Sequence, residues 1–203
     1  MAFSHRFEAT ILREYDVRGI VGKTLSADDA YAVGRGFGSA IVAKGGKTVA
    51  AGWDGRLSSP ELSGRVIQGL LDCGLDVRKS GGGPTPMLYF AARDLGLDGG
   101  VMVTGSHNPP DYNGFKMTLG KASFWGGDIQ AMGKACAEGR VASGAGHASD
   151  VAVMESYVAR LLRDYPKDGK KLNVVWDAGN GAMGEAMDTF PARTSDSGSP
   201  TIW

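Results

Sequence analysis

The stretch VMVTGSHNPPDYNGFK, residues 101–116, passes from an apolar run to a polar loop within a few residues. The apolar run lacks polar alternation, which is typical of a strand buried on both faces of a sheet. The loop after it holds a glycine, Ser106, a histidine and an asparagine, and Lys116 follows shortly. Pro109 and Pro110 each fix φ and restrict the preceding residue. The sequence therefore predicts a rigid loop that presents a serine at the end of a buried strand.

Strand-like and helix-like segments alternate around this loop. Ser26 and Asp29 have capping-box spacing at the start of a helix, and Ser59 before Pro60 is predicted to be the N-cap of another. Buried strands alternating with helices indicate an α/β fold with a mostly parallel sheet sandwiched between helices. The periodicity predicts helices over 26–46, 58–74, 85–96, 126–139 and 153–165, and strands over 47–54, 75–83 and 99–105.

The pattern also predicts how the chain is divided. Residues 1–150 form one α/β domain, and residues 151–187 begin a second with a periodic helix and the strand, glycine loop and helix of KKLNVVWDAGNGAMG. One strand with its helices cannot bury its own apolar faces, so this second α/β unit is expected to be incomplete. Residues 188–203 are polar and aperiodic, and we expect an atypical tail there that truncates the protein.

Composition and charge limit the classes of partner. Lys plus Arg and Asp plus Glu number 22 each, so the formal net charge is zero. A nucleic-acid or anionic-membrane surface needs a basic excess, so we expect neither partner. No apolar run approaches the ~18 residues of a membrane helix, and the N-terminus has no signal-like segment, so a cytoplasmic location is expected. Cys73 and Cys136 are predicted to be reduced, packed thiols.

Two common chemistries fit the sequence poorly. A serine hydrolase needs Gly-x-Ser-x-Gly, whereas Ser106 is followed by His-Asn-Pro, and adjacent side chains such as that of His107 usually diverge. The other histidines are His5, expected in an N-terminal tail, and His147, expected in a small-residue connection. A dinucleotide site is also disfavoured, because the glycines of GRGFG lie inside a predicted helix and are interpreted as close packing.

The loops that follow the predicted strands point to one crevice. In open α/β sheets, ligands bind beyond the carboxyl ends of the strands. The residues expected to converge there are cations, hydrogen-bond donors and a serine, a set that suits a phosphorylated ligand. They are Arg18, Asp54, Arg56, Ser106, His107, Asn108 and Lys116, with Asp54 expected to cap or orient its own loop.

Three motifs resemble one enzyme family. TGSHNPPDYNGFK (104–116), YDVRG (15–19) and DGRLSSPEL (54–62) are similar to motifs of the α-D-phosphohexomutases, in particular the bacterial phosphomannomutase/phosphoglucomutase branch. The resemblance extends from about residue 10 to about residue 187. It implies an isomerase of carbohydrate metabolism that interconverts the 1- and 6-phosphates of mannose or glucose by intramolecular phosphotransfer through a phosphoserine.

The resemblance also assigns roles. Ser106 would carry the phosphoryl group, Lys116 would be the general acid/base, and His107 would hydrogen-bond in the site. Hexose 1,6-bisphosphate would be the intermediate and activator, and Mg²⁺ would bind the phosphate on Ser106. The residues expected to contact substrate are Tyr15, Arg18, Arg56 and Asn108.

The sequence departs from the family pattern in two respects. Trp53 stands where the family usually has arginine, and the magnesium-binding Asp-Gly-Asp-x-Asp-Arg motif is absent from the printed sequence. One phosphate with water is a weak magnesium site, so we expect a truncated form with little activity alone. The alternative is a non-catalytic phosphosugar-binding or interaction module.

Overall fold

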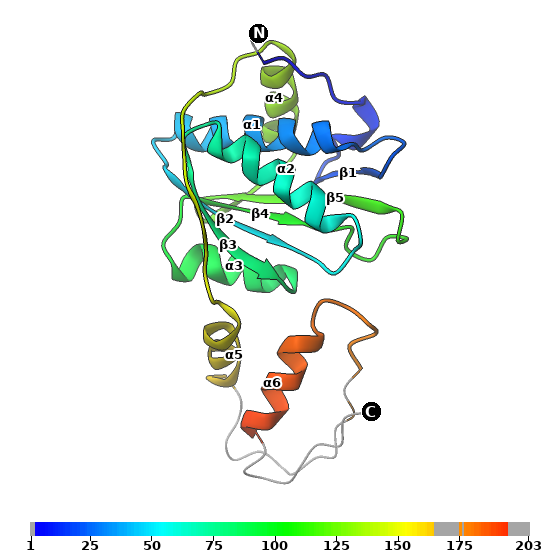
Figure 1. The fold of residues 1–203 in the computed structure, drawn as a ribbon, viewed down its shortest axis with the longest axis vertical. Coiled ribbons are helices and arrows are strands. Elements are labelled where there is room, and N and C mark those ends of the chain that lie inside the picture. Colours follow the sequence, from blue (N-terminus) through cyan, green and yellow to red (C-terminus); the bar gives the residue numbers. More distant parts are fainter. Residues whose placement is uncertain (1–2, 165–174, 176, 195–203) are drawn as a thin grey trace.

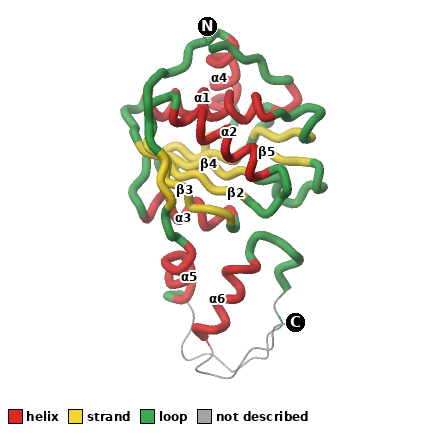
Figure 2. Tube along the Cα trace, viewed as in Figure 1, coloured by secondary structure: helices red, strands yellow, loops and turns green. Residues whose placement is uncertain are grey.

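The chain forms a sheet with helices on both faces (Figures 1 and 2). A computed structural model describes residues 3–164, 175 and 177–194, with side chains described as far as residue 189. Helices α1 and α2 cover one face of the sheet and α3 covers the other, while α4 packs on α1 (Figure 1). The helices are α1 (Ala27–Ala43), α2 (Ser59–Leu71), α3 (Thr85–Asp94), α4 (Gly127–Ala137), α5 (Met154–Leu162) and α6 (Gly184–Thr194), with a short 3-10 helix at Ala9–Ile11.

The described residues form a seven-stranded sheet of order β1-β5-β4-β2-β3-β7, with β6 paired to β5. The block β4-β2-β3-β7 is parallel, whereas β5 runs antiparallel to β4, β1 and β6. The α/β class with helices on both faces is confirmed, whereas the sheet is mixed and not mostly parallel: three of the six strand pairings among the described residues are antiparallel. The strands are β1 (Val17–Ile20), β2 (Thr48–Trp53), β3 (Asp76–Gly82), β4 (Gly99–Val103), β5 (Tyr112–Leu119), β6 (Ala122–Phe124) and β7 (Ala148–Asp150).

Strand β5 was not predicted from the sequence. It contains Asn113 and Gly114, which are both buried although asparagine and glycine are depleted in strands. The Asn113 amide donates to the hydroxyls of Ser58 and Ser59, at 2.9 and 3.0 Å. A Cβ at Gly114 would lie 2.1 Å from the carbonyl oxygen of Val17 on β1, so only glycine permits this approach. Tertiary contacts therefore override the local propensity of the segment.

The main core lies between the sheet and the α1–α2 layer. The predicted capping box of α1 is confirmed, with Ser26 and Asp29 bonded reciprocally. Phe37 of α1 is fully buried and packs edge-on against Phe124 of β6. The interpretation of the GRGFG glycines as packing positions is confirmed, since a Cβ at Gly34 would lie 2.2 Å from the carbonyl oxygen of Val66 on α2. The two helices thus pack backbone against backbone.

The N-terminal segment packs against helices, so the prediction that His5 lies in a tail is wrong. The imidazole Nε2 of His5 lies 2.8 Å from Asp29 Oδ1, and the His5 amide donates to the carbonyl of Cys136 on α4. Phe3 lies beneath the guanidinium of Arg35, with 4.9 Å between the guanidinium carbon and the ring centroid. These contacts hold the segment on α1 and α4.

Both cysteines are free and buried, as predicted. The thiol of Cys136 packs against α1 and donates to the carbonyl of Ala32, and burial raises its pKa to about 12. Burial also raises the pKa of Cys73, whose thiol donates to the carbonyl of Arg35. Protonated, enclosed thiols of this kind are packing groups.

The segment after α4 returns along the sheet edge and then leaves it (Figure 1). The predicted small-residue connection includes β7, which extends the sheet beside β3. Helix α5, assigned from sequence to the second unit, packs on α3 of the first, where Tyr157 contacts Phe90. The strand predicted near residues 172–177 lies largely outside the described residues. Helix α6 includes residues 188–194 of the predicted aperiodic tail, and residues 195–203 lie outside the described part.

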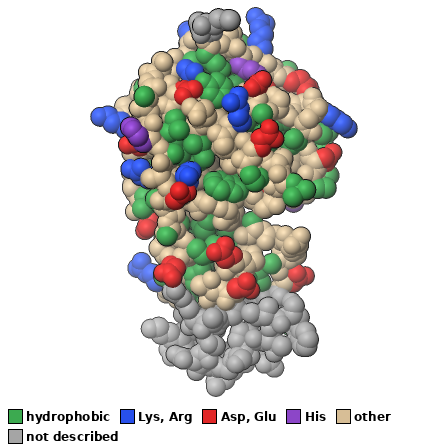
Figure 3. All heavy atoms as spheres, viewed as in Figure 1, with side chains coloured by type: hydrophobic (Ala, Val, Ile, Leu, Met, Phe, Trp, Pro, Cys, Tyr) green, Lys and Arg blue, Asp and Glu red, His purple; other side chains and the backbone are tan. Residues whose placement is uncertain are grey.

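The surface charges show no single sign on the face seen in Figure 3, where acidic and basic side chains are interspersed. In the described part of the chain, no helix has the length and hydropathy needed to traverse a bilayer. The expectation that nucleic acid is not a partner stays a prediction.

Candidate active site

Ser106 stands at the surface in a strained turn after β4. Its φ is +55°, a left-handed conformation that non-glycine residues rarely adopt and that clusters at functional sites. The hydroxyl of Thr104, which is itself buried, accepts the Ser106 amide at 2.8 Å. The strand therefore ends in a turn that exposes the serine to solvent.

Arg56 holds this turn. Its Nη1 donates to the carbonyls of Pro109 and Tyr112, at 2.6 and 3.0 Å. Its Nη2 donates to the carbonyls of Ser106 and Asn108, at 3.0 and 2.8 Å. Its Nε donates to the carboxylate of Asp54, so all five N–H groups of the guanidinium are engaged within the chain. Arg56 therefore positions the serine loop, and substrate contact by Arg56 stays a prediction.

Asp54 joins the loop after β2 to the loop after β4. Its Oδ2 accepts the Arg56 Nε and the Gly105 amide, both at 3.2 Å. Its Oδ1 accepts the Arg56 amide at 3.1 Å and the hydroxyl of Ser59 at 2.6 Å. The orienting role predicted for Asp54 is confirmed. Ser59 is not the N-cap that was predicted, because the helix already includes it and its hydroxyl is turned toward Asp54.

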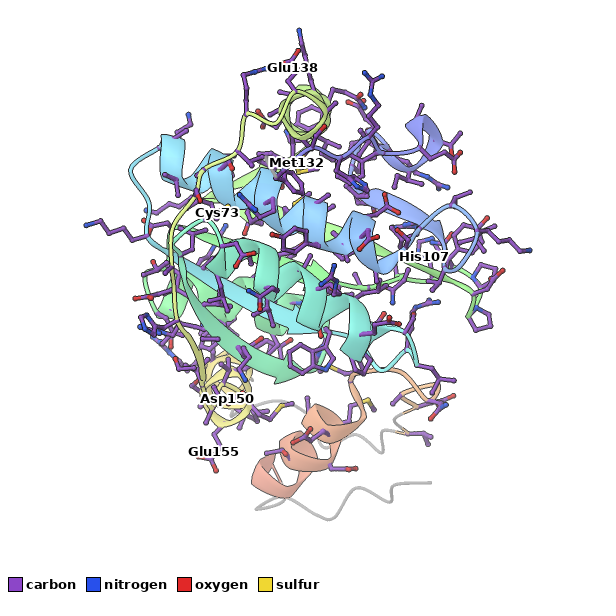
Figure 4. The ribbon with its side chains drawn as sticks, turned by 45° about the horizontal axis from the view of Figure 1, so that its top comes forward. Cys73, His107, Met132, Glu138, Asp150 and Glu155 are labelled. Carbon is purple, nitrogen blue, oxygen red and sulfur yellow. The ribbon has the colours of Figure 1, made fainter. Side chains whose placement is uncertain are left out.

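His107 and Asn108 complete the loop. The His107 Nδ1 lies 3.3 Å from the Ser106 hydroxyl oxygen, so these neighbouring side chains do not diverge as expected. The left-handed turn at Ser106 folds the backbone at this point and brings them together. Figure 4 shows His107 on the side of the molecule away from the edge strand that ends at Asp150. The Asn108 amide donates to the Gly105 carbonyl at 3.0 Å, so it braces the loop, and substrate contact by Asn108 stays a prediction.

A second cluster lies on β1 and β5. The Lys116 ammonium is 3.0 Å from Asp16 Oδ2, and Arg18 Nη2 donates to the same oxygen. The Asp16 side chain is 7% exposed, against 25% for Lys116 and 12% for Arg18. The Arg18 Nε is buried with no hydrogen-bond partner among the described residues. Two cations held by one buried carboxylate leave an excess positive charge, which suits an anionic ligand.

Asp16 was not predicted from the sequence to be a site residue. Val17 pairs with Phe115, and one more step of this antiparallel register brings Asp16 beside Lys116. The motif YDVRG contains a sign of this cluster: Asp16 and Arg18 are two positions apart, so in an extended segment their side chains lie on the same face. Its partner on β5 is 100 residues away, so the contact follows only from the sheet register.

The two clusters meet along β5. The carbonyls of Tyr112 and Gly114 contact the serine loop, because they accept hydrogen bonds from Arg56 and from the Thr104 amide. Lys116 lies two residues further along the same strand. Tyr15 is 73% exposed and stacks on Trp125 beside Lys116. The predicted residues thus form a serine loop (Arg56, Ser106, His107, Asn108) and an adjoining strand cluster (Tyr15, Arg18, Lys116).

The described residues do not fit a magnesium site by themselves. Among them, no three His, Cys, Asp or Glu side chains lie close enough together to hold a metal ion. The carboxylate nearest Ser106 in the hydrogen-bond network, Asp54, already accepts four hydrogen bonds. Magnesium binds oxygen atoms in near-octahedral geometry. Because both oxygens of Asp54 are already occupied by protein donors, Asp54 is a poor magnesium ligand.

Fold and site together define an α/β/α sandwich domain that presents a serine beyond the carboxyl ends of its parallel strands. The chain belongs to the phosphoglucomutase/phosphomannomutase family, whose alpha/beta/alpha domain I matches residues 9–132.

Relatives agree with this assignment. A Pseudomonas aeruginosa phosphomannomutase/phosphoglucomutase is 47% identical over 176 residues, 87% of this chain and 38% of the relative. A Neisseria gonorrhoeae phosphoglucomutase is 45% identical over 177 residues, again 38% of its length. A crystal structure of a Burkholderia thailandensis family protein superposes with a TM-score of 0.85 at 43% identity, covering 91% of this chain and 42% of that one. The chain spans well under half the length of these relatives.

Proposed function

We propose that this chain is the phosphoserine-bearing part of a phosphomannomutase/phosphoglucomutase that interconverts hexose 1- and 6-phosphates in the cytoplasm. The observation that carries the proposal is the exposed Ser106 in a left-handed turn, held by Arg56 and Asp54. Phosphoryl transfer requires a positioned oxygen and compensated charge more than covalent chemistry by the protein. This turn supplies the position, and the adjoining cations supply the charge.

The proposed reaction moves one phosphoryl group and one proton. The Ser106 hydroxyl oxygen forms a bond to phosphorus as the bond from phosphorus to a sugar oxygen of hexose 1,6-bisphosphate breaks. The proton lost by the serine balances the proton gained by the sugar hydroxyl. Lys116 carries this proton in the role that the family resemblance implies, and His107 Nδ1, 3.3 Å from the hydroxyl, orients it. The reverse transfer to the other sugar position completes the isomerisation.

Magnesium is part of the proposal only because the family resemblance implies it. It would neutralise phosphate charge, with the phosphate on Ser106 as one ligand, and its other ligands would lie outside the described residues. Turnover by this chain alone is therefore expected to be small.

A non-catalytic phosphosugar-binding module is the second candidate. The observation in its favour is the excess positive charge of Arg18 and Lys116 around Asp16, which can hold a phosphate without any transfer to Ser106. Such a module would bind hexose phosphates and leave Ser106 unmodified.

Mass spectrometry separates the two candidates. Incubation with glucose 1,6-bisphosphate in a magnesium buffer is expected to add one phosphoryl group per chain, located on the peptide containing Ser106. Ser106→Ala is expected to add none, whereas Ser149→Ala on the edge strand β7 behaves as the parent chain. An unmodified parent chain, or equal modification of Ser106→Ala, would favour the binding module over the mutase.

A further inference from the structure

Strand β5 has two edges, and one of them is covered by two strands that lie end to end. One edge pairs with β4, and the other pairs with β1 over residues 112–115 and with β6 over residues 117–119. Lys116 falls at the junction between them. Tyr15 lies just before β1 and Trp125 just after β6, so the topology brings two aromatic residues to this junction from segments 110 positions apart.

The structure fixes this aromatic pair. The Gly126 amide donates to the Glu14 carbonyl at 2.7 Å, which joins the turn after β6 to the turn before β1. The rings of Tyr15 and Trp125 are nearly parallel, with an interplanar angle of 13° and centroids 6.1 Å apart. Both remain open to solvent, with 73% and 49% of their surfaces exposed. Exposed rings held in place by the backbone are typical of binding surfaces.

A pocket of about 350 Å³ lies against this pair. The pocket is open to solvent on one side, and its volume lies at the lower end of the range of small-molecule sites. The Tyr89 phenol enters from α3, where burial and the charge of Asp16 raise its pKa and keep it a hydrogen-bond donor. The lining residues are Tyr15, Tyr89, Lys116, Met117, Ser123 and Trp125.

We propose that Trp125, together with Tyr15, forms the wall that binds the pyranose ring of a hexose phosphate in this pocket. This inference rests on the proposed function and adds Trp125 as a substrate-contacting residue. A pyranose ring presents an apolar face of C–H groups, which an aromatic wall removes from water. The hydroxyls of Ser123 and Tyr89 bond the sugar hydroxyls, and Lys116, with the excess charge of its cluster, attracts the phosphate.

The chemistry of the pocket selects this occupant. An inorganic anion would use Lys116 alone and gain nothing from two aromatic side chains. A purely apolar ligand would cover the hydroxyls of Ser123 and Tyr89 without offering them a hydrogen-bond partner, which costs binding energy. A sugar that carries a phosphate uses both the aromatic rings and the polar groups of the pocket.

Isothermal titration calorimetry tests the inference. Glucose 6-phosphate is expected to bind the chain, and Trp125→Ala is expected to weaken this binding about tenfold, or about 1.4 kcal/mol, through lost ring contact. Trp125→Phe keeps an aromatic wall and is expected to lose much less. Binding of inorganic phosphate is expected to be equal in the parent chain and Trp125→Ala.

A matched control is Val42→Ala, which shortens an exposed apolar side chain on α1, across the sheet from the pocket, and should leave affinity unchanged. Circular dichroism checks that each variant is folded. Undetectable binding of glucose 6-phosphate by the parent chain, or equal affinity in Trp125→Ala, would overturn the inference. Phosphorylation of Ser106 is measured separately, so that outcome leaves the proposed mutase reaction standing. The converse result, Trp125-dependent binding with an unmodified Ser106, would overturn the reaction and keep the site.

Discussion

Arg56→Ala is expected to slow phosphoryl transfer to Ser106 about 100-fold while the sheet stays folded. The guanidinium binds four carbonyls of the segment between Ser106 and Tyr112, and alanine removes every one of these bonds. The left-handed φ of Ser106 then loses the support of Arg56 and keeps only local contacts such as that with Thr104. A displacement of the nucleophile by about 1 Å can cost about 100-fold in rate.

The measurement is a time course of Ser106 phosphorylation by glucose 1,6-bisphosphate, read by mass spectrometry. Arg56→Lys should recover little of the rate, because an ammonium cannot reproduce the planar five-donor fork. Arg65→Ala is the matched control, since Arg65 lies on α2 and contacts Ala27 and Asp28 of the neighbouring helix. A rate for Arg56→Ala equal to that of Arg65→Ala would show that the guanidinium does not position the serine.

Gly34→Ala is expected to lower the free energy of unfolding by about 3 kcal/mol, the upper part of the usual range for overpacking. The added Cβ would lie 2.2 Å from the carbonyl oxygen of Val66 and 3.0 Å from the Gly69 Cα. Both contacts are backbone atoms, so no side chain can move aside. Helices α1 and α2 would have to separate, which opens the core beneath them.

Urea unfolding followed by circular dichroism measures this effect. Gly64→Ala is the control, because a Cβ at Gly64, on the neighbouring helix α2, meets nothing within 4 Å. Alanine there should stabilise the helix by about 0.5–1 kcal/mol, since glycine is a poor helix residue. If the two variants unfold at the same urea concentration, the close helix crossing is not required by the fold.

Much of the fold could be predicted from the sequence because it depends on local patterns. The capping box of Ser26 and Asp29 and the apolar period of α1 are readable within one helix. Strand β5 could not be predicted, because Asn113 and Gly114 suit a strand only once Ser58 and the Val17 carbonyl surround them. The packing of His5 on α1 likewise depends on a partner far along the chain.

In the candidate site, too, the sequence predicted what depends on a local motif and not what depends on distant partners. Ser106 was found from its own loop motif, and its strained backbone agrees with a functional role. The role of Arg56 in holding the serine loop was not predicted, because the carbonyls that accept its hydrogen bonds lie about 50 residues away in the sequence. Asp16 was missed because its contact with Lys116 follows only from the pairing of β1 with β5.

The most direct test of the central claim follows one phosphoryl group onto Ser106 and off again. The chain is phosphorylated with glucose 1,6-bisphosphate, purified, and mixed with glucose 6-phosphate. The account predicts that the Ser106 peptide loses its phosphoryl group while an equal amount of the bisphosphate appears. A phosphoryl group that stays on the serine, or leaves only as inorganic phosphate, would contradict it.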